Sequence, residues 1–235
     1  MTAQEDRGAP AAPVAPGAAP VATGAAPVAP GTAPVARALV ARALVPRALV
    51  PGALRLATLG PEGTSAHAAA DALAGAVAEE GAHLAVDLHD DFDVARRAVH
   101  DGTATAALVP SAFAGATRFH WDPALALLGV VVHPTPTYGL AVRSPATVLG
   151  PTVVIASLPE VRGLVDQLAP PALRRAHRTD RTAASTAAAA RDVAAGLADV
   201  AVCNEAGRRR HGLTWLAHRE GVPMPWSAFV RVAGR

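Results

Sequence analysis

The sequence predicts an α/β fold of two small lobes, with mainly parallel sheets and a cleft between them. From residue 54 onward, short apolar segments alternate with segments of helical propensity, the order typical of parallel strands joined by helices. The alternation forms two similar runs, each with a polar helix start that could face a shared ligand. We place lobe one at about 54–130 plus 222–235, and lobe two at about 131–221.

Residues 1–53 differ from the rest of the chain in composition. They hold nine of the 21 prolines, in APV and APG repeats, followed by Arg-Ala-Leu-Val at 37–40, 42–45 and 47–50. Frequent proline removes backbone donors, so we expect a polyproline-like or disordered tail without function. A spacing of five advances about 140° around a helix, which scatters the arginines and disfavours an amphipathic membrane helix. Deletion of this tail is predicted to leave stability and activity nearly unchanged.

The elements of the first run have local signals. Strands are short apolar or alternating segments, and helices are rich in alanine or begin at a capping residue, here Asp90 or Asp91. Glycine marks the ends of both kinds of element. In order, the run contains strand 54–59, the turn Gly60–Gly63, helix 64–80, strand 84–88, a helix that reaches His100, and strand 106–109.

The second run is assigned by the same signals. Its strands are short and rich in valine, and its helices begin at a proline or at small hydroxyl residues. In order, it contains strands 138–142 and 152–156, a helix from Pro159, strand 173–177, helix 183–195, and strands 200–203, 215–217 and 229–232.

Composition excludes several classes of function. All 21 basic residues are arginine, so neither a Schiff base nor a P-loop lysine can form. The single cysteine, Cys203, excludes an internal disulfide and a cysteine zinc site, and no metal site is expected. A net charge of +2 gives no nucleic-acid signature, and no apolar run reaches the roughly 18 residues of a membrane span. Glu5 and Asp6 stand where a secretory signal has basic residues, so we expect a cytoplasmic protein.

Two helix starts are candidate anion sites. The first is the turn that contains Glu62, Gly63, Thr64 and Ser65, where glycine admits a ligand and hydroxyl and N–H groups favour an anion. The second, at Ser185 and Thr186, offers the same groups in the other lobe. Each could equally be an ordinary helix cap. As a pair on opposite lobes, they suit a small ligand with two carboxylates.

These motifs, with their order along the chain, resemble the prephenate dehydratase fold family, whose lobes are similar to those of periplasmic binding proteins. Several stretches resemble one branch more closely, the non-aromatising prephenate decarboxylases of bacilysin-type natural-product pathways. The stretches that resemble the decarboxylase branch are Thr58–Ser65, Thr135–Arg143, Asn204-Glu205 and Pro223–Phe229.

The chain also departs from the dehydratase pattern. Dehydratases have Thr-Arg-Phe where this chain has Ser227-Ala228-Phe229, and Ala112 stands within a stretch that is polar in dehydratases. His67 stands where both the dehydratases and the decarboxylases usually have an acidic residue. Prephenate that loses CO2 aromatises if an acid helps its ring hydroxyl to leave, and stays non-aromatic if a ring carbon is protonated instead. The altered motif therefore favours decarboxylation alone.

The resemblance implies a carboxy-lyase that acts on prephenate, retains the ring hydroxyl and needs no cofactor or metal. A dehydratase that makes phenylpyruvate and a non-catalytic binding module stay open as alternatives, as does a homodimer. No nucleic-acid or membrane partner is expected. Ser227 and His67 are the predicted catalytic residues. The predicted substrate-binding residues are Glu62, Gly63, Thr64, Ser65, Tyr138, Ser185, Thr186 and Asn204.

Overall fold

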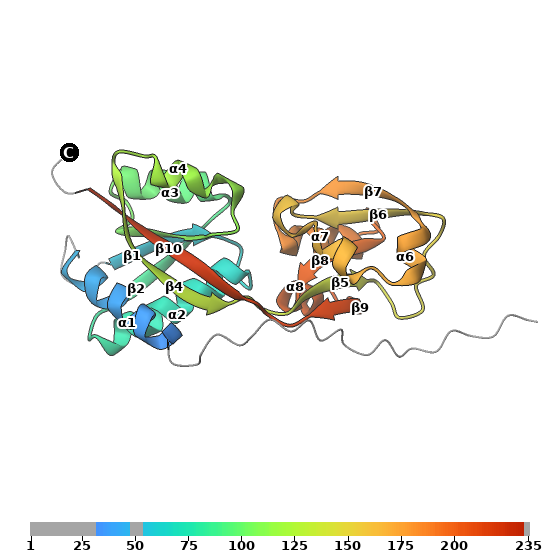
Figure 1. Ribbon diagram of the computed structural model, residues 1–235, viewed down its shortest axis with the longest axis horizontal. Helices are drawn as coiled ribbons and strands as arrows, with labels where there is room; N and C mark the ends of the chain where they lie inside the picture. Colours follow the sequence, from blue (N-terminus) through green and yellow to red (C-terminus); the bar gives the residue numbers. More distant parts are fainter. Residues whose placement is uncertain (1–31, 48–53, 233–235) are drawn as a thin grey trace, which may run out of the picture.

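The computed structural model describes residues 32–47 and 54–232, which form two α/β lobes side by side (Figure 1). The two-lobed α/β fold predicted from the sequence is confirmed. The sheets are mixed rather than mainly parallel, because each contains two parallel and two antiparallel strand pairings. The antiparallel pairings involve β10 (Pro223–Arg231) in lobe one and β5 (Tyr138–Val142) in lobe two. Both are strands through which the chain enters a lobe after crossing from the other.

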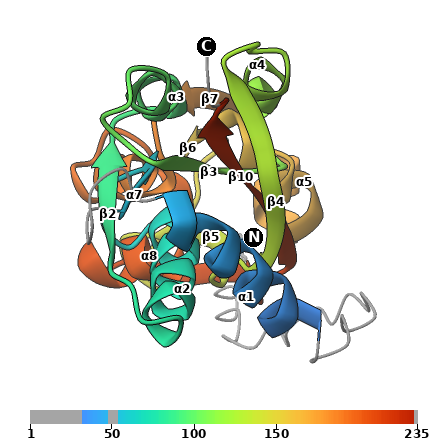
Figure 2. The same ribbon diagram turned by 90° about the vertical axis from the view of Figure 1, so that its left-hand side faces the viewer.

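Lobe one is a five-stranded sheet in the order β2-β1-β3-β10-β4. Figures 1 and 2 show α1 and α2 on one face of this sheet and α3 and α4 on the other. A continuous apolar core lies between these layers, with Leu56, Leu73 and Phe229 among its fully buried side chains. The bounds are β1 Leu54–Leu59, β2 Leu84–His89, β3 Ala106–Pro110, β4 Leu125–Pro134, α1 Thr32–Leu44, α2 Ser65–Glu79, α3 Phe92–His100, α4 Thr117–His120, and the 3-10 turns η1 Val45–Arg47 and η2 Ala114–Ala116.

Lobe two repeats this plan with the order β7-β6-β8-β5-β9. Its sheet separates two apolar clusters, one beneath α7 around Ala189 and Val193, the other beneath α5 and α6 around Val165 and Leu173. The bounds are β6 Thr152–Ser157, β7 His177–Thr182, β8 Val200–Asn204, β9 Thr214–Arg219, η3 Pro159–Val161, α5 Leu164–Leu168, α6 Pro171–Arg175, α7 Thr186–Ala194 and α8 Glu205–Arg210.

Helix α1 corrects the prediction of an unstructured N-terminal tail. Val40, Ala41 and Leu44 are buried against the core of lobe one, in contact with α2 and β4. Together with Arg37 they follow the i, i+3, i+4, i+7 spacing of a helix face. The sequence reasoning followed the arginines of the repeat, whereas the apolar residues between them carry the helical period. The other residues of the predicted tail, 1–31 and 48–53, lie outside the described residues.

Further differences concern single elements. The predicted strand 173–177 is wrong, because Pro171 starts the short helix α6 and the strand β7 follows it. Strand β7 is polar and mostly exposed at the sheet edge, so it carries no apolar pattern. Strand β4 and helix α8 were not predicted.

The two lobes are joined by two crossing segments that lie side by side. Thr135 N donates to Val222 O at 2.9 Å, and Val222 N donates to Thr135 Oγ1 at 3.2 Å. A Cβ on Gly221 would lie 1.7 Å from the Thr135 carbonyl oxygen, so the close approach of the two segments requires glycine there. The two hydrogen-bonded crossing segments determine which sides of the lobes face each other.

Candidate active site

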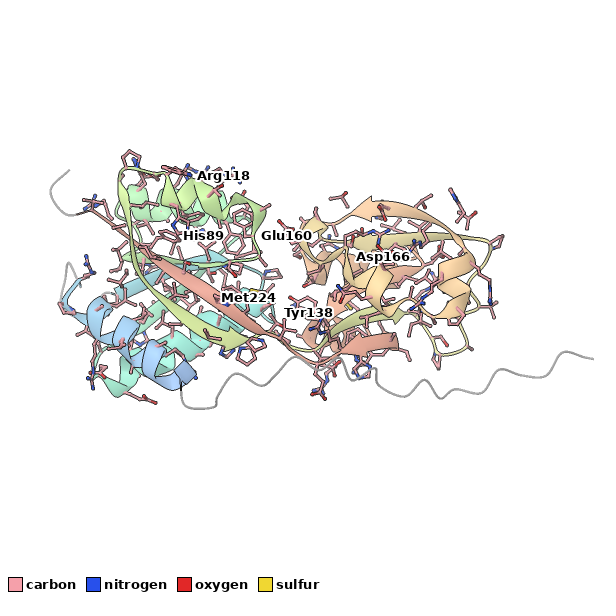
Figure 3. The ribbon with its side chains drawn as sticks, viewed as in Figure 1. His89, Arg118, Tyr138, Glu160, Asp166 and Met224 are labelled. Atoms are coloured by element: carbon pink, nitrogen blue, oxygen red, sulfur yellow. The ribbon has the colours of Figure 1, made fainter. Side chains whose placement is uncertain are left out.

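A cavity of about 530 Å³ lies between the lobes and is lined by both of them. Its lobe-two wall carries the start of α7, Tyr138 and Arg219, and its lobe-one wall combines apolar residues with Thr64, Ser65, Arg118 and the carboxylates Asp90, Asp91 and Asp93. Figure 3 shows Tyr138 and Met224 close to the crossing segments, with Glu160 nearer the open side. The apolar lobe-one residues are Leu59, Ala66, Phe92, Pro110, Ala112, Phe113, Met224 and Trp226.

The start of α2 borders this cavity through Thr64, Ser65 and Ala66. Thr64 is the N-cap: its Oγ1 accepts from His67 N at 3.2 Å and donates to Leu59 O at 3.2 Å. The N–H groups of Ser65 and Ala66 have no acceptor within the helix, as at every helix start. Thr64 therefore shapes the turn, and the next two residues offer free donors to the cavity.

The start of α7 enters the same cavity from lobe two. Ser185 is its N-cap, with Oγ accepting from Ala188 N at 3.0 Å, and Thr186 is the first helical residue. Both are buried and both line the cavity. The sequence-predicted pairing of the two helix starts across the cleft is thus present in the structure.

Tyr138 joins the two helix starts. Its hydroxyl is hydrogen-bonded to Ser65 Oγ on lobe one and lies near the Thr186 side chain on its own lobe. Burial raises the pKa of Tyr138, which keeps the phenol protonated and able to donate. We call Ser65, Tyr138 and Thr186 the hydroxyl cluster. Because one phenol oxygen reaches both helices, the two helix starts form a single polar site rather than two separate ones.

Asn204 links the lobes but does not line the cavity. Its Nδ2 donates to Gly63 O at 2.9 Å, and its Oδ1 accepts from Gly207 N at 2.8 Å as the N-cap of α8. Gly63, which has a positive φ of 81°, is thereby held against lobe two, while Glu62 is exposed on the turn. Asn204 and Gly63 thereby brace the turn that carries Thr64. Asn204, Gly63 and Glu62 do not line the cavity, and their contact with the substrate stays a prediction.

The two residues predicted to be catalytic also lie outside the cavity lining. The ring of His67 is engaged elsewhere, since Nδ1 accepts from Gly63 N at 3.2 Å and Nε2 lies 3.3 Å from Asp71 Oδ2. Ser227 follows Trp226, which faces the cavity, and successive side chains of a strand point to opposite faces. The catalytic roles of His67 and Ser227 stay predictions.

The sequence reasoning missed the charged residues of the cleft. Arg118 is paired with Asp93 at 2.5 Å and lies over the Phe113 ring, whereas Arg219 donates to the Gln167 amide oxygen at 3.3 Å. Arg219 of β9 pairs with Tyr138 of the adjacent strand β5, which is 81 positions away in sequence. No local motif could therefore have indicated Arg219. Exposed carboxylates also line the cleft at Asp90, Asp91, Glu160 and Glu220.

Within 32–47 and 54–232, no group of three or more His, Cys, Asp or Glu side chains could hold a metal ion. In that part of the chain, no helix has the length and apolar character needed to cross a membrane.

Two solved structures share the fold. Prephenate dehydratase from Arthrobacter aurescens, solved in complex with L-Phe, matches with a TM-score of 0.55 and 24% identity, over 77% of this chain and 61% of that one. A periplasmic substrate-binding protein of an ABC transporter from Coxiella burnetii matches with a TM-score of 0.53 and 18% identity, over 76% and 85%. This chain therefore spans less than two thirds of the dehydratase chain.

Similarity in sequence identifies the family. No protein-family model matches the chain. The prephenate decarboxylase of Bacillus subtilis (strain 168) is 34% identical over 176 residues, which cover 73% of this chain and 84% of that protein. The prephenate decarboxylase of Planktothrix agardhii (strain NIVA-CYA 126/8) is 31% identical over 176 residues, which cover 75% and 87%. The chain belongs to the prephenate decarboxylase family.

Proposed function

We propose that this protein is a prephenate decarboxylase. It removes CO2 from prephenate, protonates a ring carbon and leaves the ring hydroxyl in place, which gives a dihydro-4-hydroxyphenylpyruvate for natural-product biosynthesis. Membership in the family supports the reaction, and the cleft supports the substrate. The observation that carries the proposal is the meeting of two helix starts from opposite lobes at Tyr138, inside one cavity.

The polar side of the cavity suits a carboxylate. Free N–H groups at the starts of α2 and α7 favour an anion, and the hydroxyls of Ser65, Tyr138 and Thr186 can turn toward it as donors. Thr64 and Ser185 contribute indirectly, since their hydroxyls cap the helices and fix where the N–H groups point.

The apolar side suits the ring and the outcome of the reaction. When the bond to the departing carboxylate breaks, its electron pair passes into the ring diene, and a new C–H bond forms at a ring carbon. Aromatisation requires an acid at the ring hydroxyl. The wall of lobe one offers Ala112, Phe113 and Trp226 there, and the nearby Asp93 carboxylate is held by Arg118. An apolar surface at the ring hydroxyl would support its retention, and the exposed carboxylates Asp90 and Asp91 of the same wall are the acids that this binding mode must keep away from it.

The proposal is tested by incubating the full chain with prephenate. CO2 release that scales with enzyme concentration and matches prephenate consumption is the expected result. Phenylpyruvate formed in step with CO2 would instead identify a dehydratase. Prephenate binding without consumption would identify a binding module.

A further inference from the structure

The charges of the cavity are unevenly distributed. Arg118, on lobe one, is neutralised by Asp93. Arg219, on lobe two, has no carboxylate within ion-pair distance among the described residues, although Glu220 is its neighbour in the chain. The one side-chain hydrogen bond of Arg219 in that part of the structure, to Gln167, leaves most of the five guanidinium donors available.

Arg219 lies beside the hydroxyl cluster. It pairs in register with Tyr138 across the antiparallel strands β5 and β9, so the two side chains are neighbours on one face of the sheet, and both line the cavity. The uncompensated cation, the phenol and the two helix starts are therefore gathered at one end of the cleft. The opposing wall presents Phe92, Phe113 and the buried Trp226, together with the exposed carboxylates Asp90 and Asp91.

Prephenate has two carboxylates with opposite fates. The carboxylate on the pyruvyl arm keeps its charge throughout the reaction. The carboxylate on the ring loses its charge as it becomes CO2, so donors that bind it would stabilise the substrate more than the transition state and slow the reaction. A cation and several donors are useful only at the carboxylate that remains.

We infer that Arg219, together with the hydroxyl cluster, binds the pyruvyl carboxylate of the substrate, and that the departing ring carboxylate faces Phe92, Phe113 and Trp226 of lobe one. The inference rests on the proposed function for its substrate. It assigns Arg219 as a specificity-determining residue and the polar end of the cleft as a single site for 2-oxo acids. It also replaces the expectation from the sequence of one carboxylate at each helix start.

Two probes separate the carboxylates. Phenylpyruvate carries the 2-oxo-acid arm without a ring carboxylate, and 1-methylcyclohexa-2,5-diene-1-carboxylate carries the ring carboxylate without the arm. Their dissociation constants would be measured by calorimetry for wild type, Arg219→Gln, Arg219→Lys and the matched control Arg175→Gln. Arg175 is exposed on α6 and lies outside the cavity lining. Thermal melts of all variants would verify that they fold.

Wild type is expected to bind phenylpyruvate and not the ring-carboxylate probe. Arg219→Gln should weaken phenylpyruvate binding about 10–100-fold, the range for losing a charged hydrogen bond, while Arg219→Lys recovers part of the loss and Arg175→Gln changes nothing. In prephenate turnover, Arg219→Gln should raise KM far more than it lowers kcat. Unchanged phenylpyruvate binding in a folded Arg219→Gln variant would overturn the inference, as would tight binding of the ring-carboxylate probe that depends on Arg219. Absence of CO2 release by wild type would refute the proposed function instead, since binding of the probes is measured without turnover.

Discussion

Substitution of Leu44 by alanine should destabilise lobe one strongly, although it lies in a segment whose sequence indicates a tail. Leu44 is fully buried in the core of lobe one, whereas Leu39 on the same helix is 62% exposed. Leu44→Ala removes a buried side chain and leaves a cavity, which costs about 3 kcal/mol and lowers Tm by roughly 6–12 °C for a protein of this size. Leu39→Ala, the matched control, should stay within about 0.5 kcal/mol of wild type. Urea denaturation and thermal melts followed by circular dichroism measure both.

A second variant tests the same packing from the sheet side. A Cβ on Gly129 of β4 would lie 2.8 Å from Val40 Cγ2 of α1. Gly129→Ala should therefore destabilise wild type but cost less in a Val40→Ala background, a coupling that a double-mutant cycle detects. Equal stabilities of Leu44→Ala and Leu39→Ala, with no coupling between Gly129 and Val40, would refute the packing of α1 on lobe one.

Two further predictions concern the cleft and α8. Thr186→Val removes a hydroxyl that contacts Tyr138 and should weaken prephenate use by about 1–3 kcal/mol in kcat/KM; unchanged kinetics would mean that the start of α7 does not touch the substrate. The hydrogen bond from Arg208 lowers the pKa of Glu205 from 4.5 to about 2. A lowered pKa stabilises the fold above pH 4.5, and this stabilisation is lost as the pH falls toward 2. The unfolding free energy of wild type should therefore fall by about 0.5–1 kcal/mol more than that of Glu205→Gln over that range, a small amount because the ion pair is open to solvent. Urea titrations at each pH measure the difference, and Glu79→Gln, exposed at the end of α2, should behave like wild type.

Local signals predicted much of the framework. The strand, turn and helix from Leu54 to Glu79 were predicted almost to the residue, because apolar alternation, a glycine turn and a hydroxyl cap lie next to one another in sequence. Asp91 as the N-cap of α3 was one of two choices. Strand β7 and helix α1 were not predicted, for different reasons. Strand β7 is polar because it lies at a sheet edge, whereas repeats and prolines mask the helical period of α1.

The site was predicted in part for the same reason. Ser65, Tyr138 and Thr186 were named because each belongs to a recognisable motif, and the fold then brings them together. Arg219 reaches the cleft only through the pairing of β5 with β9, and Asn204 acts as a brace only because it meets Gly63 across the lobes. Such contacts between distant residues depend on the tertiary arrangement and leave no mark in the local sequence.

Proton NMR of the quenched prephenate reaction tests the central claim most directly. Decarboxylation with retention of the hydroxyl predicts a product that keeps vinyl signals and a carbinol proton, formed at a rate proportional to enzyme concentration. The apolar surface of Ala112, Phe113 and Trp226, placed against the ring hydroxyl, is the reason to expect no phenyl signals beyond those of the reaction without enzyme. Phenyl signals that grow with enzyme concentration would contradict the account.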